Sequence, residues 1–228
     1  LFTEGKFTEA QAQFQRFTRE YSGNPFMSQA SLGNAACFAA QGKTEEATST
    51  VNRFIRTYPT HEHIDYAYYL KALINFDRSS SILLRVARQD MSARDLGAPT
   101  QSLTDFGDVV GRYPNSPYAE DSRQRMIYLR NRLALHDLDV GIFYYNREAY
   151  VSAAGRAKYL LETYPQSSVE NDAVALLTAA YTAMGQDTLA QDSRRILEAN
   201  DPQHPYLTGK WPKRRSQFSA LVPFSGEY

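Results

Sequence analysis

The chain has 228 residues, enough for one or two ordinary domains or for one elongated array of repeats. Lys plus Arg and Asp plus Glu each number 25, so the net charge is zero and the composition excludes a global attraction to nucleic acid. No run of eighteen apolar residues is present, so the sequence predicts no membrane-spanning helix, and its one cysteine, Cys37, cannot form an internal disulfide.

Segments that read as helices end in a tyrosine at several points along the chain. Proline lacks the backbone N–H and disfavours helical geometry in the residue before it, so each Tyr-Pro pair predicts the end of a helix. A looser copy of the pattern has its proline four residues after the tyrosine. The tyrosines are Tyr21 (the looser copy), Tyr58, Tyr113 and Tyr164.

A second pattern, a glycine followed five residues later by an alanine, precedes several of these ends. The glycine closes one helix with a tight turn, and the alanine lets the next helix pack closely against its partner. In the last copy Asn200 takes the place of the tyrosine. The glycines are Gly5, Gly42 and Gly185.

The two patterns together resemble the tetratricopeptide repeat, in which two antiparallel helices form a unit of about 34 residues. The sequence therefore predicts an all-α fold, a right-handed α-solenoid of about five helix pairs of which the first is incomplete. Two middle units are longer than the repeat: we expect extra material at residues 77–99 in one and a single long helix over residues 116–146 in the other.

The middle of the chain resembles the BamD family, the lipoprotein subunits of the bacterial outer-membrane β-barrel assembly machinery. One matching stretch runs from Phe54 to Tyr69 and includes Pro59, His61 and Asp65. The resemblance covers roughly residues 1–200 and extends through the irregular insertion of the third unit. Its insertion residues are Asp90, Ser92, Arg94 and Asp95.

The resemblance implies a non-enzymatic scaffold on the periplasmic face of the outer membrane, anchored in the full-length protein by a lipid on an N-terminal cysteine that this chain lacks. It implies binding to the periplasmic domains of the barrel-forming subunit BamA, to other lipoproteins of the complex and to unfolded outer-membrane proteins. A generic cell-envelope repeat adaptor that binds a different protein is the alternative.

One aromatic stripe is a candidate groove for substrate. Tyr66, Tyr69, Leu73 and Phe76 are spaced to share one face of a helix. They are expected to line an apolar groove for an extended segment within residues 1–112, although ordinary packing between helices is the competing interpretation.

Charged and polar residues are candidates for partner docking, chiefly in the C-terminal units, residues 113–200. For Arg123 and Arg130 the alternative is a solvated helix face, because exposed ion pairs contribute little. The candidates of the last unit are what the resemblance implies, since the family docks BamA largely through its C-terminal repeats. The insertion residues could dock a partner or simply hold the insertion in place. The docking candidates are Asp187, Gln191, Arg194, Arg195, Arg123 and Arg130.

The remaining features predict no chemistry of their own. His61 and His63 lie two apart rather than at the four-residue spacing of helical zinc ligands, so no metal site and no cofactor are expected. No nucleophile or phosphate-loop motif is present, which argues against an enzyme. Residues 201–228 form a proline-rich basic tail that includes Lys210 and Trp211; a weak lipid or nucleic-acid contact, a linker or packing on the last helix are its alternatives.

Overall fold

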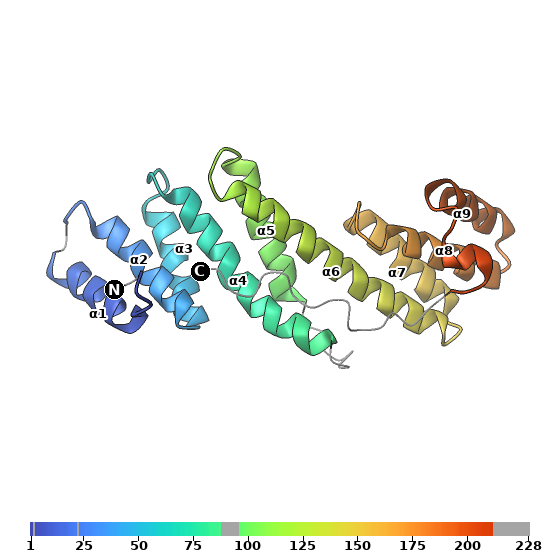
Figure 1. Cartoon of the computed structure of the whole chain (residues 1–228), viewed down its shortest axis with the longest axis horizontal. Coiled ribbons are helices and arrows are strands. Elements are labelled where there is room, and N and C mark those ends of the chain that lie inside the picture. The colour runs from blue at the N-terminus through green and yellow to red at the C-terminus, as the bar shows by residue number, and fades with distance from the viewer. Residues whose placement is uncertain (2, 22, 88–95, 212–228) are drawn as a thin grey trace. The chain divides into compact units, whose positions relative to one another are not determined.

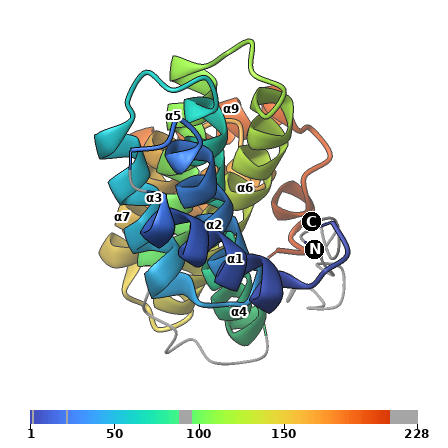
Figure 2. The same cartoon turned by 90° about the vertical axis from the view of Figure 1, so that its left-hand side faces the viewer.

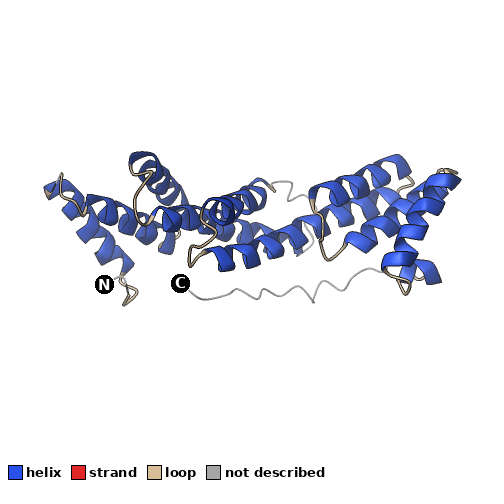
Figure 3. Ribbon diagram, turned by 90° about the horizontal axis from the view of Figure 1, so that it is seen from above, coloured by secondary structure: helices blue, strands red, loops and turns tan. Residues whose placement is uncertain are grey.

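The computed structural model describes residues 1–211 apart from 2, 22 and 88–95, and in that part of the chain every regular element is a helix (Figures 1 and 3). The all-α prediction is confirmed. The elements are α1 (Phe7–Glu20), α2 (Met27–Ala40), α3 (Thr44–Thr57), α4 (Ile64–Ala87), α5 (Gly97–Arg112), α6 (Ala119–Tyr145), α7 (Tyr150–Thr163), α8 (Glu170–Ala183), α9 (Asp187–Asn200) and the short 3-10 helix η1 (Pro205–Thr208).

Helices that follow one another in the chain pack together, as helix-pair repeats require: α1 with α2, α2 with α3, α3 with α4, α4 with α5, α7 with α8 and α8 with α9. Figure 2 shows α1, α2 and α3 side by side at the N-terminal end. Among the described residues α1 therefore stands as the second helix of an incomplete unit, and four full pairs follow it, beginning with α2 and α3.

The turn between the two helices of a unit has one recurring backbone shape. Gly5, Gly42 and Gly185 adopt the left-handed conformation there, with φ of 73°, 71° and 66°. In the unit of α6 and α7 the same place is held by Glu148, at φ 62°. Five residues after each of these positions lies a buried alanine, the small side chain that lets the paired helices approach. These alanines are Ala10, Ala47, Ala153 and Ala190.

The predicted helix ends are confirmed at all four tyrosines. Tyr21, Tyr58, Tyr113 and Tyr164 each follow the last helical residue, with φ between −120° and −130°, and each N–H still donates to the carbonyl four residues earlier. The placement of Asn200 in this series is wrong. Asn200 is the last residue of α9, and Asp201 is the residue that leaves the helix, because Pro202 constrains the residue directly before it.

The described chain divides into two compact units, with the boundary between Met126 and Ile127, inside α6. In the first unit the core forms where α2, α3 and α4 meet, around Val51, Phe54 and Leu70, all at most 4% exposed. In the second unit Leu160 and Leu176 are fully buried.

Both long units differ from a standard repeat as expected. α4 has 24 residues and α6 has 27, against 14 in each of α2, α3, α7, α8 and α9. The predicted helix over residues 116–146 is thus confirmed, with its ends at Ala119 and Tyr145. The extra length of the third unit includes the C-terminal part of α4, which continues to Ala87.

The chain that follows α9 packs against the last helix pair. Tyr206, Leu207 and Trp211 contact the cluster of Val174 and Leu197. Asp172 of α8 fixes the segment, because its Oδ1 accepts from Trp211 Nε1 at 3.1 Å and lies 3.3 Å from the Nε2 atom of buried His204. Residues 201–211 therefore complete the packing of the second unit.

Candidate functional site

The aromatic stripe of α4 lies against the segment that starts α6. The ring of Tyr69 stacks on Tyr118 with centroids 4.8 Å apart, and Tyr66 packs on the same ring at 5.3 Å. Phe76 is only 5% exposed and meets Phe106 edge to face. The stripe is therefore largely a contact between helices within the first compact unit.

Polar contacts hold the middle of this stripe in place. The Tyr69 hydroxyl donates to Asp121 Oδ2 at 2.7 Å, and Arg125 Nε donates to the same oxygen at 2.6 Å. The guanidinium of Arg125 also lies 4.9 Å from the centre of the Phe76 ring, a cation–π contact. Burial, together with the hydrogen bond to Asp121, raises the pKa of Tyr69, so its hydroxyl stays a donor at neutral pH.

The fourth stripe residue, Leu73, is half-buried, as are Tyr66 and Tyr69. Each of these three side chains keeps part of its surface exposed. Binding of substrate at this groove stays a prediction.

A buried polar network joins α4 to α5 and was missed in the sequence. Asp105, 2% exposed, accepts from Lys71 Nζ at 2.8 Å, Asn75 Nδ2 at 2.7 Å and Gln101 Nε2 at 3.0 Å. Because three donors surround it, the buried carboxylate is compensated. The available signal was the spacing of Asp105 with buried Ser102 and Val109, which places an acidic residue on the apolar face of α5.

The docking candidates of α9 all lie on the exposed surface of the second unit. Arg194 donates to Glu198 at 2.8 Å and Arg195 pairs with Asp192, while Asp187 and Gln191 are also exposed. Two apolar residues that the sequence analysis did not single out share the exposed surface of this helix. Leu189 is 45% exposed and Ile196 is 52% exposed, and they are two helical turns apart.

The docking candidates of α6 differ from those of α9. Arg123 lies in the first unit and pairs with Glu120 at 3.2 Å. Arg130 lies in the second unit, is half-buried, and has a buried Nε atom without a hydrogen-bond partner. Nearby in the second unit, burial raises the pKa of Asp137 although the Arg156 guanidinium 3.0 Å away lowers it. The insertion residues Asp90, Ser92, Arg94 and Asp95 lie outside the described residues.

The histidines before α4 have structural contacts. His61 Nε2 lies 2.9 Å from Ser28 Oγ, and its Nδ1 accepts from the N–H of His63 at 3.0 Å. In the part of the chain that the structure describes, no three His, Cys, Asp or Glu side chains gather as metal ligands would. Across the same residues, the helices are too short or too polar to span a bilayer.

Comparison with known proteins gives matches over most of the chain. The family YfiO, described as outer membrane lipoprotein, matches residues 2–196. The outer membrane protein assembly factor BamD of Xylella fastidiosa (strain 9a5c) is 46% identical over 227 residues, covering 100% of this chain and 78% of the relative. The protein of the same name from Neisseria meningitidis serogroup A is 33% identical over 205 residues, covering 90% of this chain and 77% of the relative. That from Haemophilus influenzae is 29% identical over 200 residues, covering 86% and 75%.

Proposed function

The chain belongs to the YfiO family of outer membrane lipoproteins, and from this membership we propose that it is a non-enzymatic scaffold that holds the barrel-forming subunit BamA and unfolded β-barrel substrates together. The coarser role follows directly from the family: the chain is an outer membrane protein assembly factor, associated with the outer membrane. Beyond this coarser role, we propose the binding partners, a position on the periplasmic side of the membrane, and separate regions of the chain for substrate and for partner.

The exposed surface of α9 is the observation that carries the docking half of the proposal. Leu189 and Ile196 leave apolar surface open to solvent between charged neighbours, an arrangement typical of a protein interface. Arg194 and Arg195 are held by acidic neighbours on their own helix. These exposed ion pairs stabilise the helix only weakly. When an acidic partner surface binds, the two arginines would instead form ion pairs across the interface.

The N-terminal units, residues 1–112, are proposed to receive the unfolded substrate, and residues 113–200 to dock the partner. The half-buried edges of Tyr66, Tyr69 and Leu73 support the first assignment, because tyrosine offers apolar area and a hydrogen-bonding hydroxyl together. Binding both proteins to one chain raises the local concentration of substrate at the subunit that inserts it.

The docking half is tested by titrating this chain with the purified periplasmic domains of BamA from the same organism. Double reversal, Arg194→Glu with Arg195→Glu, is expected to weaken binding at least about ten-fold, and Ile196→Asp likewise, because buried charge pairs and apolar anchors dominate interfaces. Affinity is measured by isothermal titration calorimetry, with folding checked by circular dichroism.

Two matched controls separate docking from general charge and hydrophobicity. Arg16→Glu reverses an exposed arginine that pairs with Glu20 four residues on, the same local arrangement as Arg194 with Glu198, but in the first unit. Val151→Asp alters an apolar residue of α7 that is 76% exposed. Neither control is expected to change affinity. Equal loss in the controls would move the contact away from α9, and no binding by the unaltered chain would favour the generic adaptor.

A further inference from the structure

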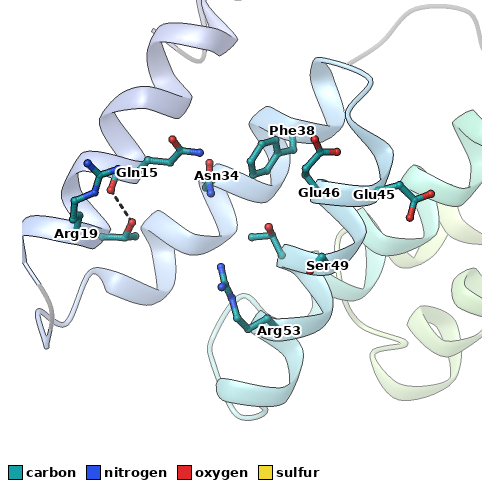
Figure 4. Close-up of a pocket in the computed structure, with 10 residues that line it drawn as sticks. Gln15, Arg19, Asn34, Phe38, Glu45, Glu46, Ser49 and Arg53 are labelled. Atoms are coloured by element: carbon teal, nitrogen blue, oxygen red, sulfur yellow. Dashed lines mark hydrogen bonds between the residues drawn. The ribbon is translucent and has the colours of Figure 1, made fainter.

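A solvent-open surface cavity of about 630 Å³ lies in the first compact unit, between α1 and α3 and over α2 (Figure 4). α1 and α3 are the second helices of successive units, and α2 is the helix between them in the chain. The volume lies in the range of small-ligand and peptide pockets. The residues that line it include Arg19, Asn34, Phe38, Glu46 and Arg53.

Asn34, which lines the cavity, has a side-chain acceptor atom without a hydrogen bond. Its side chain is 9% exposed, and its Oδ1 atom is buried with no hydrogen-bond partner. In Figure 4 it lies between the α1 residues on one side and the α3 residues on the other. Leaving a buried carbonyl unpaired destabilises a fold, and a bound amide N–H would remove that cost.

Two arginines lie on opposite walls of the cavity. Arg19 of α1 and Arg53 of α3 are exposed, and neither forms an ion pair within the described part of the chain. Arg16, on another face of α1, is instead paired with Glu20 at 2.8 Å. Both arginines line the cavity, and a guanidinium without an ion pair in the described residues is suited to bind a carboxylate.

The charge changes sign along the α3 wall. Glu46, exposed and without an ion pair in the described residues, lies two helical turns before Arg53, which is about 10 Å along the helix axis. About three residues of extended chain cover that distance. Phe38 lies at the acidic end of the cavity in Figure 4, where it offers apolar surface.

From these observations we infer that the cavity binds an extended peptide whose carboxylate lies between Arg19 and Arg53, whose backbone N–H bonds to Asn34, and whose basic side chain, about three residues away, lies at Glu46. The inference rests on the proposed function in that unfolded protein is the bound material. It adds a second contact surface, separate from the stripe of α4, and the charge pattern of the segment held there.

The test is an NMR titration of the whole chain with short synthetic peptides. The reference peptide has blocked ends and carries one Asp and one Lys three residues apart; matched peptides replace Asp with Asn, or Lys with Gln. The side-chain amide signal of Asn34, assigned by its loss in Asn34→Leu, is expected to shift with the reference peptide. Replacing Asp is expected to weaken binding about ten-fold. An Asn peptide with a free C-terminus distinguishes a chain-end carboxylate from a side-chain one.

Variants of the protein complete the test. Arg19→Gln and Arg53→Gln are each expected to weaken binding about ten-fold, while Arg56→Gln, the same change on α3 at a residue that does not line the cavity, leaves it unchanged. Asn34→Leu is expected to abolish binding without lowering the melting temperature, because it removes an unpaired buried polar atom.

Two results would overturn the inference: no shift of the Asn34 amide with any carboxylate peptide, or a marked fall in melting temperature for Asn34→Leu, which would give Asn34 a structural role. Either result leaves the docking assay on α9 intact, since that assay uses a different surface and a folded partner. Loss of docking with peptide binding retained would refute only the proposed partner.

Discussion

Glu148 adopts the left-handed backbone conformation that glycine adopts at the equivalent turn of other units. The equivalent turn uses glycine in three other units, because the left-handed conformation brings the Cβ atom of other residues close to the following carbonyl. The Glu148 side chain is exposed and forms no hydrogen bond or ion pair with the described part of the chain that would compensate for this strain. The turn of α6 and α7 is therefore held in shape by its surroundings, at some cost in stability.

Replacing Glu148 by glycine is expected to stabilise the chain by about 0.5–1 kcal/mol, since relief of about 1–2 kcal/mol of strain outweighs the greater flexibility of glycine in the unfolded state. The opposite change at an equivalent turn, Gly185→Ala, is expected to destabilise by about 1 kcal/mol. Urea unfolding followed by circular dichroism measures both. A lower unfolding midpoint for Glu148→Gly would show that the side chain has a role beyond the turn.

At the scale of the helix, two glycines differ in how closely a neighbouring helix approaches them. Gly141 of α6 has no room for a side chain, because a Cβ atom built there would lie 2.6 Å from Leu176 Cδ2 of α8, whose side chain is fully buried. Gly155 of α7 has nothing within 4 Å of the same position. Only the first glycine is required by packing.

Alanine at these two positions is expected to have opposite effects. Gly141→Ala should destabilise by about 1–3 kcal/mol, because Leu176 must move within a packed core. Gly155→Ala should stabilise by about 0.5–1 kcal/mol, because alanine loses less backbone freedom in a helix. Thermal unfolding compares the two variants. A stabilising Gly141→Ala would mean that α6 and α8 are separated by more than the structure shows.

The helices could be predicted from the sequence because their signals are local. Proline acts on its immediate neighbour, so the ends at Tyr58, Tyr113 and Tyr164 follow from adjacent residues. The prediction at Asn200 was one residue early, because the position equivalent to Tyr58 of the Gly42 unit is Asp201, sixteen residues after Gly185 and directly before Pro202. α6 was recognisable because no proline occurs between residues 118 and 146.

The candidate sites could be predicted less well because their contacts are distant in sequence. Lys71 lies 34 residues from Asp105, and pairing them requires knowing how α4 packs on α5. The arginines of the cavity come from α1 and α3, whereas the groove predicted from the sequence lies on α4, the helix of Tyr66 and Tyr69. Periodicity located the stripe of α4 but could not separate a groove from a contact between helices.

For the whole chain, the packing of successive helices predicts that the stability of each region depends mainly on the interfaces with its immediate neighbours. Arrays of helix pairs lose structure near a weakened interface before they lose it elsewhere. Leu197, fully buried in α9, belongs to the second compact unit, whereas the core around Phe54 belongs to the first.

Leu197→Ala is expected to destabilise its surroundings by about 2–5 kcal/mol and to speed amide hydrogen exchange in α8 and α9 while leaving α2 and α3 unchanged. Phe54→Ala should give the reverse pattern. Hydrogen exchange followed by mass spectrometry resolves the two regions. Acceleration throughout the chain in either variant would indicate one cooperative unfolding unit instead of a stack.

Trp211 is the chain's only tryptophan, and it donates to Asp172 beside the ring of Tyr206. Intrinsic tryptophan fluorescence therefore reports on one place only, the contact between residues 201–211 and the last helix pair. Every other part of the array is silent in that signal. A partner that covers α9 or displaces this segment would change the emission without any attached dye, which gives the docking surface its own built-in optical reporter.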